Sequence, residues 1–238
     1  MSAGAKQAPY IADTAVKTVS STTPFPASTA NAISAAVPLW LRCIEIVVSI
    51  SVLILTFPIM LAEAIIICVG TPGPPLFFQT RVGHNFKHFK FVKFRTFYHD
   101  AKARYPEMYA YKFTEDQLNT YKIKGENDPR VTPQGVWLRR LSIDELPNFW
   151  NVLMGDMALV GPRPEIPEHL PYYKGEMLEK FMVRQGVTGL AQISGRGRLT
   201  FYETAKYDVE YARTRTPLMD LKILLRTAWL ILRDRGAF

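Results

Sequence analysis

One long apolar run dominates the pattern of hydrophobic and polar positions along the chain. Between Ile44 and Val69 the sequence IEIVVSISVLILTFPIMLAEAIIICV contains only two charged residues, Glu45 and Glu63. A helix of this length, at about 1.5 Å per residue, covers the hydrocarbon core of a bilayer. Pro58 removes a backbone donor, so the pattern predicts a membrane helix over residues 37–70 that bends at Pro58. The run alone fits a helix that crosses the membrane and one that re-enters on the same side equally well.

The segments on either side of this run have different patterns. Residues 1–36 are rich in Ala, Ser and Thr without apolar periodicity, which predicts a disordered tail. No secretory signal is predicted, because the apolar run begins too late and is too long. TPGPP at 71–75 predicts a turn, and FKHFKFVKFRTF at 86–97 alternates with the period of a strand. Helical segments are expected within 100–111.

Two helices are predicted in the C-terminal half. One spans Leu146–Met154, and the other spans residues 217–236 as a strongly apolar helix with a thin basic stripe of Lys222, Arg226 and Arg233. The second helix fits either the core or the lipid headgroup region. The patterns together predict an α+β protein: a membrane-embedded helix plus a small, mostly helical catalytic domain over residues 71–238, with interfacial amphipathic helices.

The charge is distributed unevenly. Residues 1–70 hold three basic and three acidic side chains, so the whole net charge of +8 lies after residue 70. An excess of Lys and Arg after the apolar run predicts that residues 71–238 stay in the cytoplasm. A basic body indicates an anionic partner, which nucleic acid, a phospholipid surface or a phosphorylated substrate would each satisfy. The two cysteines and four histidines lack metal-binding spacing, and no chemistry is assigned to them.

The most informative stretch for chemistry is RRLSIDELPNFWNVLMGDMALVGPRP at 139–164. Its adjacent carboxylates, Asp144 and Glu145, are flanked by arginines. Ser142 and Glu145 match a capping box, so one interpretation is that these acids only begin a helix near Asp144. The other is that an ionised carboxylate attacks a phosphorus atom whose oxygens are neutralised by cations and a divalent metal. The positive charge would come from Lys93, Arg95, Arg139, Arg163 and the segment VRQGVTGLAQISGRGR at 183–198.

Five blocks make the sequence resemble the bacterial sugar transferase family, the monotopic polyprenyl-phosphate hexose-1-phosphate transferases. In order, they are GTPGPPLFFQTRVG, KFRTF, RRLSIDELPNFWNVLMGDMALVGPRP, VRQGVTGLAQISGRG and YDVEYARTRTPLMDLKIL. The resemblance extends from about Val47 to the C-terminus. Two departures stand out: Phe57-Pro58 replaces the family's frequent Ser-Pro, and Arg184-Gln185-Gly186 replaces its common R-P-G, which is expected to loosen that turn.

The resemblance implies transfer of a sugar 1-phosphate from a UDP-sugar to polyprenyl (undecaprenyl) phosphate, with release of UMP. This reaction starts the synthesis of a bacterial surface glycan, such as exopolysaccharide, O-antigen, capsule or glycoprotein, at the cytoplasmic face of the inner membrane. It also implies that Asp144 is a ligand of Mg²⁺ and the nucleophile that forms a covalent phosphosugar intermediate. Glu145 would assist proton removal from the polyprenyl phosphate or position the partner. The matching phosphate-binding residues are Lys93, Arg139 and Arg163, and the matching substrate-binding residues are Arg184, Gln192, Arg196 and Asp208.

The sequence is also compatible with two other functions, and no nucleic-acid partner is expected. A membrane glycosyltransferase would release UDP instead of UMP. A membrane-anchored, non-catalytic module would bind anionic lipid through its bases, but the paired carboxylate would repel phosphate there. The released nucleotide separates these three alternatives.

Overall fold

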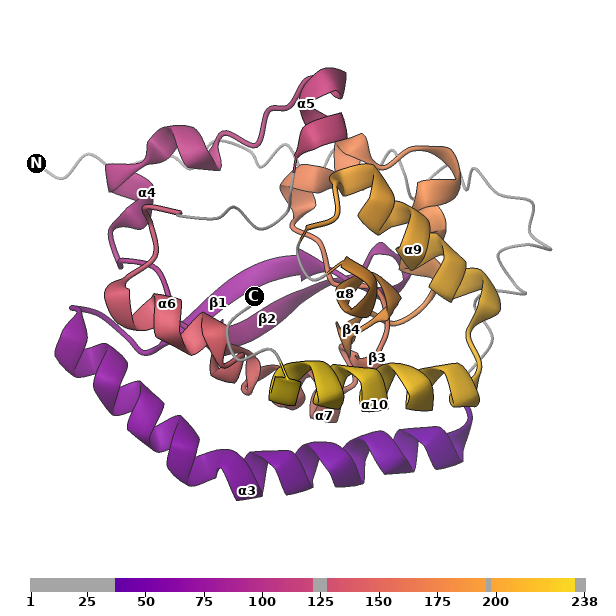
Figure 1. Ribbon diagram of the computed structural model, residues 1–238, viewed down its shortest axis with the longest axis horizontal. Coiled ribbons are helices and arrows are strands. Elements are labelled where there is room, and N and C mark those ends of the chain that lie inside the picture. The colour runs from indigo at the N-terminus through magenta and orange to yellow at the C-terminus, as the bar shows by residue number, and fades with distance from the viewer. Residues whose placement is uncertain (1–36, 122–127, 196–197, 234–238) are drawn as a thin grey trace, which may run out of the picture.

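The computed structural model describes residues 37–121, 128–195 and 198–233, so the predicted tail of residues 1–36 lies outside the described residues. One long helix, α3 (Leu39–Gly70), runs along one side of a body of short helices (Figure 1). The body also contains two two-stranded sheets, β1–β2 and β3–β4. The structure is therefore mixed helix and small sheet, with a single long apolar helix before the body.

Helix α3 has the length and composition of a membrane helix. Over the described residues it is the one helix long and apolar enough to cross a bilayer. It has 32 residues, contains Pro58, and bends near its middle (Figure 1). A proline at position 58 leaves the Ile54 carbonyl without its helical donor. The Thr56 hydroxyl does not replace that donor, because it bonds to the oxygen of Val52 at 2.7 Å.

Both ends of α3 contact the same body. Near the start, Arg42 donates to the carbonyl oxygens of Val152 and Leu153, each at 2.7 Å. These carbonyls lie in the last turn of α7 (Asn148–Met154), where a cation complements the helix dipole. Near the other end, Ile67 packs into a small apolar cluster with Phe94 and Leu138. The helix is thus attached to the body near both of its ends.

Arg95 holds the turn that follows α3. Its side chain is buried, with Nε donating to the oxygen of Pro74 at 2.8 Å and Nη2 to the oxygens of Thr71 and Gly73 at 3.1 and 3.2 Å. A guanidinium close to the C-terminal end of a helix satisfies carbonyls that the helix itself cannot. The basic strand pattern predicted that Arg95 is one of the cations that face phosphate. The structure shows that it fixes the TPGPP turn instead.

The predicted basic strand belongs to an antiparallel hairpin. Strand β1 (Leu76–Val82) pairs with β2 (His88–Phe94), with Leu76 opposite Phe94, and η1 (His84–Phe86) connects them. The side chain of Asn151 on α7 bonds β2 from its other edge, accepting from the Val92 nitrogen at 3.1 Å and donating to the Lys90 oxygen at 2.7 Å. The hairpin is therefore fixed to α7.

Short helices fill the segment between the hairpin and the second sheet. Helix α7 begins two residues after the predicted start at Leu146. The remaining elements of this segment are α4 (Ala101–Arg104), η2 (Pro106–Tyr109), α5 (Glu115–Thr120), α6 (Pro133–Arg140) and η3 (Ile143–Glu145).

At the second sheet, the backbones of Gly161 and Gly186 approach each other closely. Strand β3 (Ala158–Val160) runs parallel to β4 (Gly186–Thr188), with η4 (Pro167–Tyr172) and η5 (Gly175–Met182) between them in sequence. A Cβ on Gly186 would lie 2.1 Å from the nitrogen of Gly161, so no larger residue fits. The neighbouring Gln185 is fully buried and donates to the oxygens of Lys180 and Val183. These bonds join Gln185 to the residues just before it, and the loosening relative to the family's proline stays a prediction.

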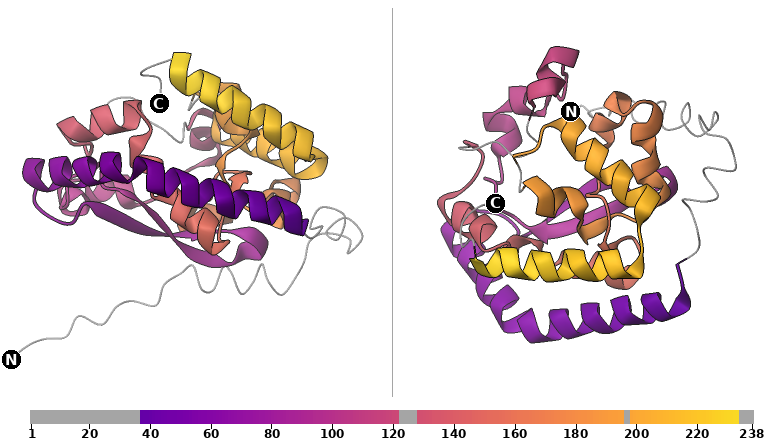
Figure 2. Two further views of the ribbon diagram at one scale, coloured as in Figure 1. Left: turned by 90° about the horizontal axis from the view of Figure 1, so that it is seen from below. Right: turned by 45° about the vertical axis from the view of Figure 1, so that its right-hand side comes forward.

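The chain continues through α8 (Leu190–Gly195), α9 (Phe201–Thr214) and α10 (Pro217–Arg233). Only Ile223 and Leu230 of α10 are buried, so the interpretation of this segment as a core helix is wrong. Figures 1 and 2 show α10 and α3 along the same side of the body. Large apolar side chains exposed on the two helices include Leu39, Val47, Leu55, Ile65 and Val69 of α3 and Leu218, Leu221, Leu225, Trp229 and Leu232 of α10.

The main core lies between the hairpin, the second sheet and the last two helices. It contains Phe91, Val152, Met157, Leu159, Val160, Val183, Tyr211, Ala212 and Ile223. Close packing of these apolar side chains is the main source of stability for a domain of this size. The core also fixes the ends of β2 and β3, from which the site residues project.

Candidate active site

The paired carboxylates lie in the short turn η3, just before α7. Ser142 has a left-handed backbone (φ 55°) and its side chain caps no helix. The predicted capping box is therefore wrong, because in this conformation the Ser142 hydroxyl does not reach the following amides. Asp144 is 5% exposed, so its carboxylate faces the protein interior. A buried carboxylate needs compensating charge, and the structure supplies it from three directions.

Three cations from separate elements interact electrostatically with Asp144. Lys93 comes from β2, Arg139 from the last turn of α6 and Arg163 from the loop after β3. Arg139 is fixed by a 3.0 Å hydrogen bond from Nε to the Thr96 hydroxyl, and its guanidinium carbon lies 4.6 Å from the centre of the Phe97 ring. The structure thus brings together the three residues that the sequence assigned to phosphate binding.

Lys93 has an unusual protonation equilibrium. Burial lowers its pKa to about 7; Asp144 opposes this shift, and Arg139, Arg81 and Arg163 add to it. The three arginines act as like charges that disfavour the ammonium. An anion bound among these side chains would favour the charged form, so Lys93 is suited to respond to a phosphate group.

Arg163 is paired with Glu145. Its two terminal nitrogens donate to the two carboxylate oxygens, a bidentate arrangement that fixes both side chains. The backbone of its loop is bonded to β4, since Gly161 N donates to Thr188 O at 2.8 Å and Gly186 N to Pro162 O at 2.9 Å. The sequence GPRP therefore presents Arg163 from a loop that is hydrogen-bonded to a strand.

Two further charged residues belong to the site, Arg81 and Glu63, and neither was predicted from the sequence. Arg81 interacts electrostatically with Glu165, Arg163 and Glu145; burial lowers its pKa to about 10. Glu63 of α3 is 2% exposed, interacts with Asp144, and has no hydrogen-bond partner for either carboxylate oxygen within the described part of the chain. The sequence contains a signal for each residue. Arg81 lies in the QTRVG part of a block that resembles the family, and Glu63 is a charge inside an apolar run.

The residues predicted to bind the substrate have different surroundings from one another. Arg184 pairs with Glu45 at 2.8 Å, which joins α3 to the body. Asp208 is 1% exposed and pairs with Lys180 at 2.8 Å. Gln192 has a buried side-chain amide with no hydrogen-bond partner in the described ranges. Arg196 lies outside the described residues. Arg184 and Asp208 are thus held in ion pairs with residues other than Asp144 and Glu145.

Comparison with known proteins finds a matching family profile and several relatives. A family profile described as bacterial sugar transferase matches residues 37–234. Galactosyl transferase CpsE of Streptococcus agalactiae is 40% identical over 166 residues, which cover 69% of this chain and 36% of the relative. Undecaprenyl-phosphate galactose phosphotransferase of Salmonella typhimurium is 35% identical over 197 residues, covering 83% and 41%.

A relative of similar length is also found. Exopolysaccharide production protein ExoY of Rhizobium meliloti is 31% identical over 199 residues, covering 83% of this chain and 87% of the relative. The chain therefore spans less than half the length of the first two relatives and most of the length of the third. The profile match includes α3, the paired carboxylates and the cations around them. On these grounds the chain belongs to the bacterial sugar transferase family.

Proposed function

We propose that this protein transfers a sugar 1-phosphate from a UDP-sugar to undecaprenyl phosphate, releasing UMP, as the first step in making a bacterial surface glycan. The observation that carries the proposal is the buried carboxylate of Asp144, set among Lys93, Arg139 and Arg163. A carboxylate attacks phosphorus only where cations offset the charge of the phosphate oxygens. The names of relatives such as undecaprenyl-phosphate galactose phosphotransferase support the same reaction class.

In the first step, a carboxylate oxygen of Asp144 forms a bond to the β-phosphorus of the UDP-sugar. The bond from this phosphorus to the oxygen that bridges it to the α-phosphate breaks, and UMP leaves with the electron pair. The sugar phosphate is then attached to Asp144 as an acyl phosphate. Lys93, Arg139 and Arg163 hold the phosphate oxygens during this exchange, so their charge is greatest where the transition state is most negative.

In the second step, an oxygen of undecaprenyl phosphate attacks the same phosphorus and Asp144 leaves as a carboxylate. Glu145 assists by accepting a proton from the lipid phosphate or by positioning it. Because Glu145 and Arg163 form a bidentate pair, a phosphate that binds Arg163 competes with Glu145 for its nitrogens. Arrival of a phosphate would then free an oxygen of Glu145 beside the incoming lipid.

We also propose that a magnesium ion binds beside Asp144. Magnesium commonly binds through one or two carboxylates together with substrate phosphates. Asp144 and Glu63 would supply two carboxylates, and the Glu63 oxygens have no hydrogen-bond partner among the described residues. Among the same residues, no group of three or more His, Cys, Asp or Glu side chains is suited to a metal. Bound there, Mg²⁺ would neutralise phosphate oxygens.

The direct test measures the released nucleotide. Purified protein is incubated with UDP-glucose, UDP-galactose and further UDP-sugars, undecaprenyl phosphate, and either Mg²⁺ or EDTA, and UMP and UDP are quantified. We expect UMP with at least one sugar, and loss of UMP in EDTA. UDP as the product would instead establish plain glycosyl transfer. Absence of both nucleotides with every sugar tested would favour a binding module.

A second proposal concerns the membrane: α3 enters from the cytoplasmic face of the inner membrane, bends at Pro58 and returns to that face. Contacts of both helix ends with one body support it, because a straight helix of 32 residues would extend about 48 Å and carry one end across a bilayer. The excess of basic side chains after residue 70 supports a cytoplasmic body. The exposed apolar side chains of α3 and α10 would then lie in lipid.

Cysteine labelling in intact cells tests this topology. Cys43 and Cys68 are replaced by alanine, and single cysteines are introduced by Ser20→Cys before the helix and by Asp116→Cys in the body. A reagent that does not cross the inner membrane is expected to label neither until the cells are permeabilised. Labelling of the Ser20→Cys variant alone in intact cells would show that α3 spans the membrane. Labelling of both would show that the body is not cytoplasmic.

A further inference from the structure

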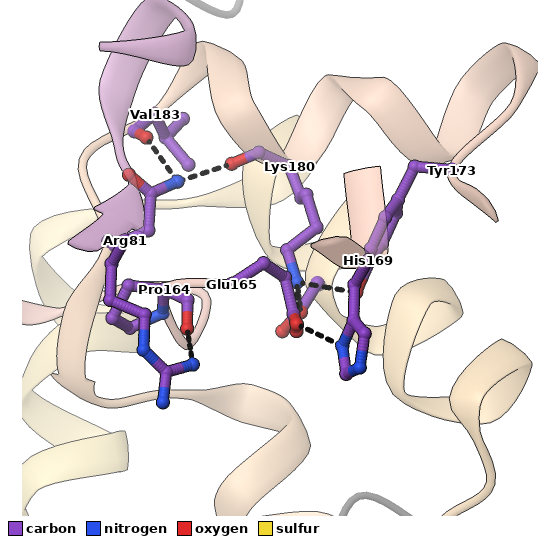
Figure 3. Close-up of polar contacts among 9 residues, drawn as sticks. Arg81, Pro164, Glu165, His169, Tyr173, Lys180 and Val183 are labelled. Carbon is purple, nitrogen blue, oxygen red and sulfur yellow. Dashed lines mark hydrogen bonds and ion pairs between the residues drawn. The ribbon is translucent and has the colours of Figure 1, made fainter. Parts of the chain in front are cut away.

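A buried network of ion pairs lies next to the loop that carries Arg163. Lys180 of η5 has no exposed surface, and its ammonium lies 2.8 Å from an Asp208 oxygen and 3.4 Å from a Glu165 oxygen. Its third contact is the hydroxyl of Tyr173 at 3.2 Å. Glu165 also accepts a bond from Nδ1 of His169 at 3.1 Å. Figure 3 shows the side chains of Lys180 and His169 converging on Glu165.

Glu165 connects this network to the loop. It is separated from Arg163 only by Pro164, and its backbone oxygen accepts a bond from Val82 N at 2.8 Å. Arg81, next to Val82 in β1, donates to the oxygen of Pro164 at 3.0 Å (Figure 3). The loop is therefore held through its backbone by β1, while the carboxylate of Glu165 is held by Lys180.

The network of Glu165, Lys180 and Asp208 carries charge that complements the two neighbouring arginines, Arg81 and Arg163. Lys180 lies between two carboxylates, so the three side chains carry one excess negative charge when all are ionised. Arg81 interacts favourably with Glu165 and unfavourably with Arg163. Glu165 therefore offsets the repulsion between two arginines that face the same site. Loss of this carboxylate would leave the repulsion between Arg81 and Arg163 without this offset.

The protonation of the network agrees with this account. Burial would raise the pKa of Glu165, but Lys180, His169 and Arg81 hold it well below its usual range. Burial would lower the pKa of Lys180, but Asp208 and Glu165 raise it. Both side chains are thus kept charged inside the protein. A buried ion pair is a poor source of stability compared with apolar packing, so its presence points to a different use.

We propose that the network of Glu165, Lys180 and Asp208 is a positioning device that sets Arg163 against Glu145 and the phosphate site. Asp208 then acts from α9 through Lys180 and Glu165, and none of the three touches the substrate. Glu165→Gln is the sharpest variant, because it keeps the size of the side chain, removes the charge that faces Arg81, and leaves the Lys180–Asp208 pair intact. The fold is expected to survive this change.

The first measurement does not depend on activity. In hydrogen–deuterium exchange, Glu165→Gln is expected to increase uptake in peptides covering residues 160–166. The matched control is Lys174→Met, which removes an exposed lysine–glutamate pair with Glu115 and should leave this segment unchanged. Uptake in the segment equal to that of the wild type would overturn the proposal, even if the protein lacked transferase activity.

The second measurement rests on the proposed function. Misplacement of Arg163 by a fraction of an ångström to about 1 Å is expected to lower kcat for UMP release by about 10- to 100-fold, with a smaller change in KM. In an Arg163→Ala background the same Glu165→Gln change should then alter kcat less than about twofold, because the residue through which it acts is already absent. Equal losses in both backgrounds would show that Glu165 does not act through Arg163.

Discussion

Asp144→Asn is expected to abolish UMP release, including the release that occurs with UDP-sugar alone. The substitution keeps the shape of the side chain and removes the charge that attacks phosphorus. Loss of a nucleophile lowers turnover by about 10⁴-fold or more in well-characterised enzymes. Asp144 is buried beside Lys93, Arg139 and Arg163, so water has little access to replace it as the attacking group. Quantification of UMP by chromatography measures the effect.

The same chemical change at an exposed position is the control. Asp116→Asn lies in the first turn of α5 and should leave UMP release unaltered. Mass spectrometry after rapid quench of wild-type protein mixed with UDP-sugar should show a phosphohexose on the peptide that contains Asp144. No adduct under rapid quench, together with a requirement for both substrates before any UMP appears, would establish direct transfer. The covalent step would then be rejected.

Arg163→Ala is expected to reduce turnover by about 10²-fold or more, since it removes one preorganised positive group from the phosphate oxygens. The folded yield and Tm should change little, because the loop backbone stays bonded to β4. Arg140→Ala is the matched control: it has the same chemistry, is exposed, and lies beside Arg139 in sequence. The measurement is steady-state UMP formation alongside thermal unfolding. A parallel loss of activity and of folded protein would assign Arg163 a structural role instead.

A double variant separates the two causes of the expected loss. Arg163→Ala removes an attraction for phosphate and also leaves the carboxylate of Glu145 without its bidentate partner. If the second effect dominates, Arg163→Ala with Glu145→Gln should be more active in the first half-reaction than Arg163→Ala alone. If the lost attraction dominates, the double variant should be no better.

Local patterns predicted α3, β2, α7 and α10, but they did not predict β1, β3, β4 or α9. The apolar run from Ile44 to Val69, the alternation around Lys93 and the helix ending at Met154 each depend on neighbours a few residues away, and each is present as a helix or strand. The capping box illustrates the limit of such patterns. Thr200 and Glu203 form both bonds of that motif at the start of α9, whereas Ser142 and Glu145 do not. The left-handed backbone of Ser142 decides this, and a four-letter pattern does not encode it.

The site was predicted in part. Family blocks identified Asp144, Glu145, Lys93, Arg139 and Arg163, which the structure brings together. The blocks do not distinguish an arginine that faces the site from one that bonds a turn or a distant carboxylate. Ion pairs between remote residues have no local signature, so the structural roles of Arg95, Arg184 and Asp208 and the contribution of Arg81 became visible only in three dimensions.

The hydrogen bonds and the ion pair that hold the start of α3 involve residues that the ribosome translates much later. Arg42 bonds to residues 110 and 111 positions later, and Glu45 pairs with Arg184, 139 positions later. At about 5–20 residues per second, a ribosome reaches Arg184 roughly 7–28 s after Glu45. During this interval, of the two arginines that contact Glu45, only Arg42, one turn away, has been synthesised. Until Val152, Leu153 and Arg184 have been translated, the orientation of the helix therefore depends on its own sequence and on the basic residues that directly follow it.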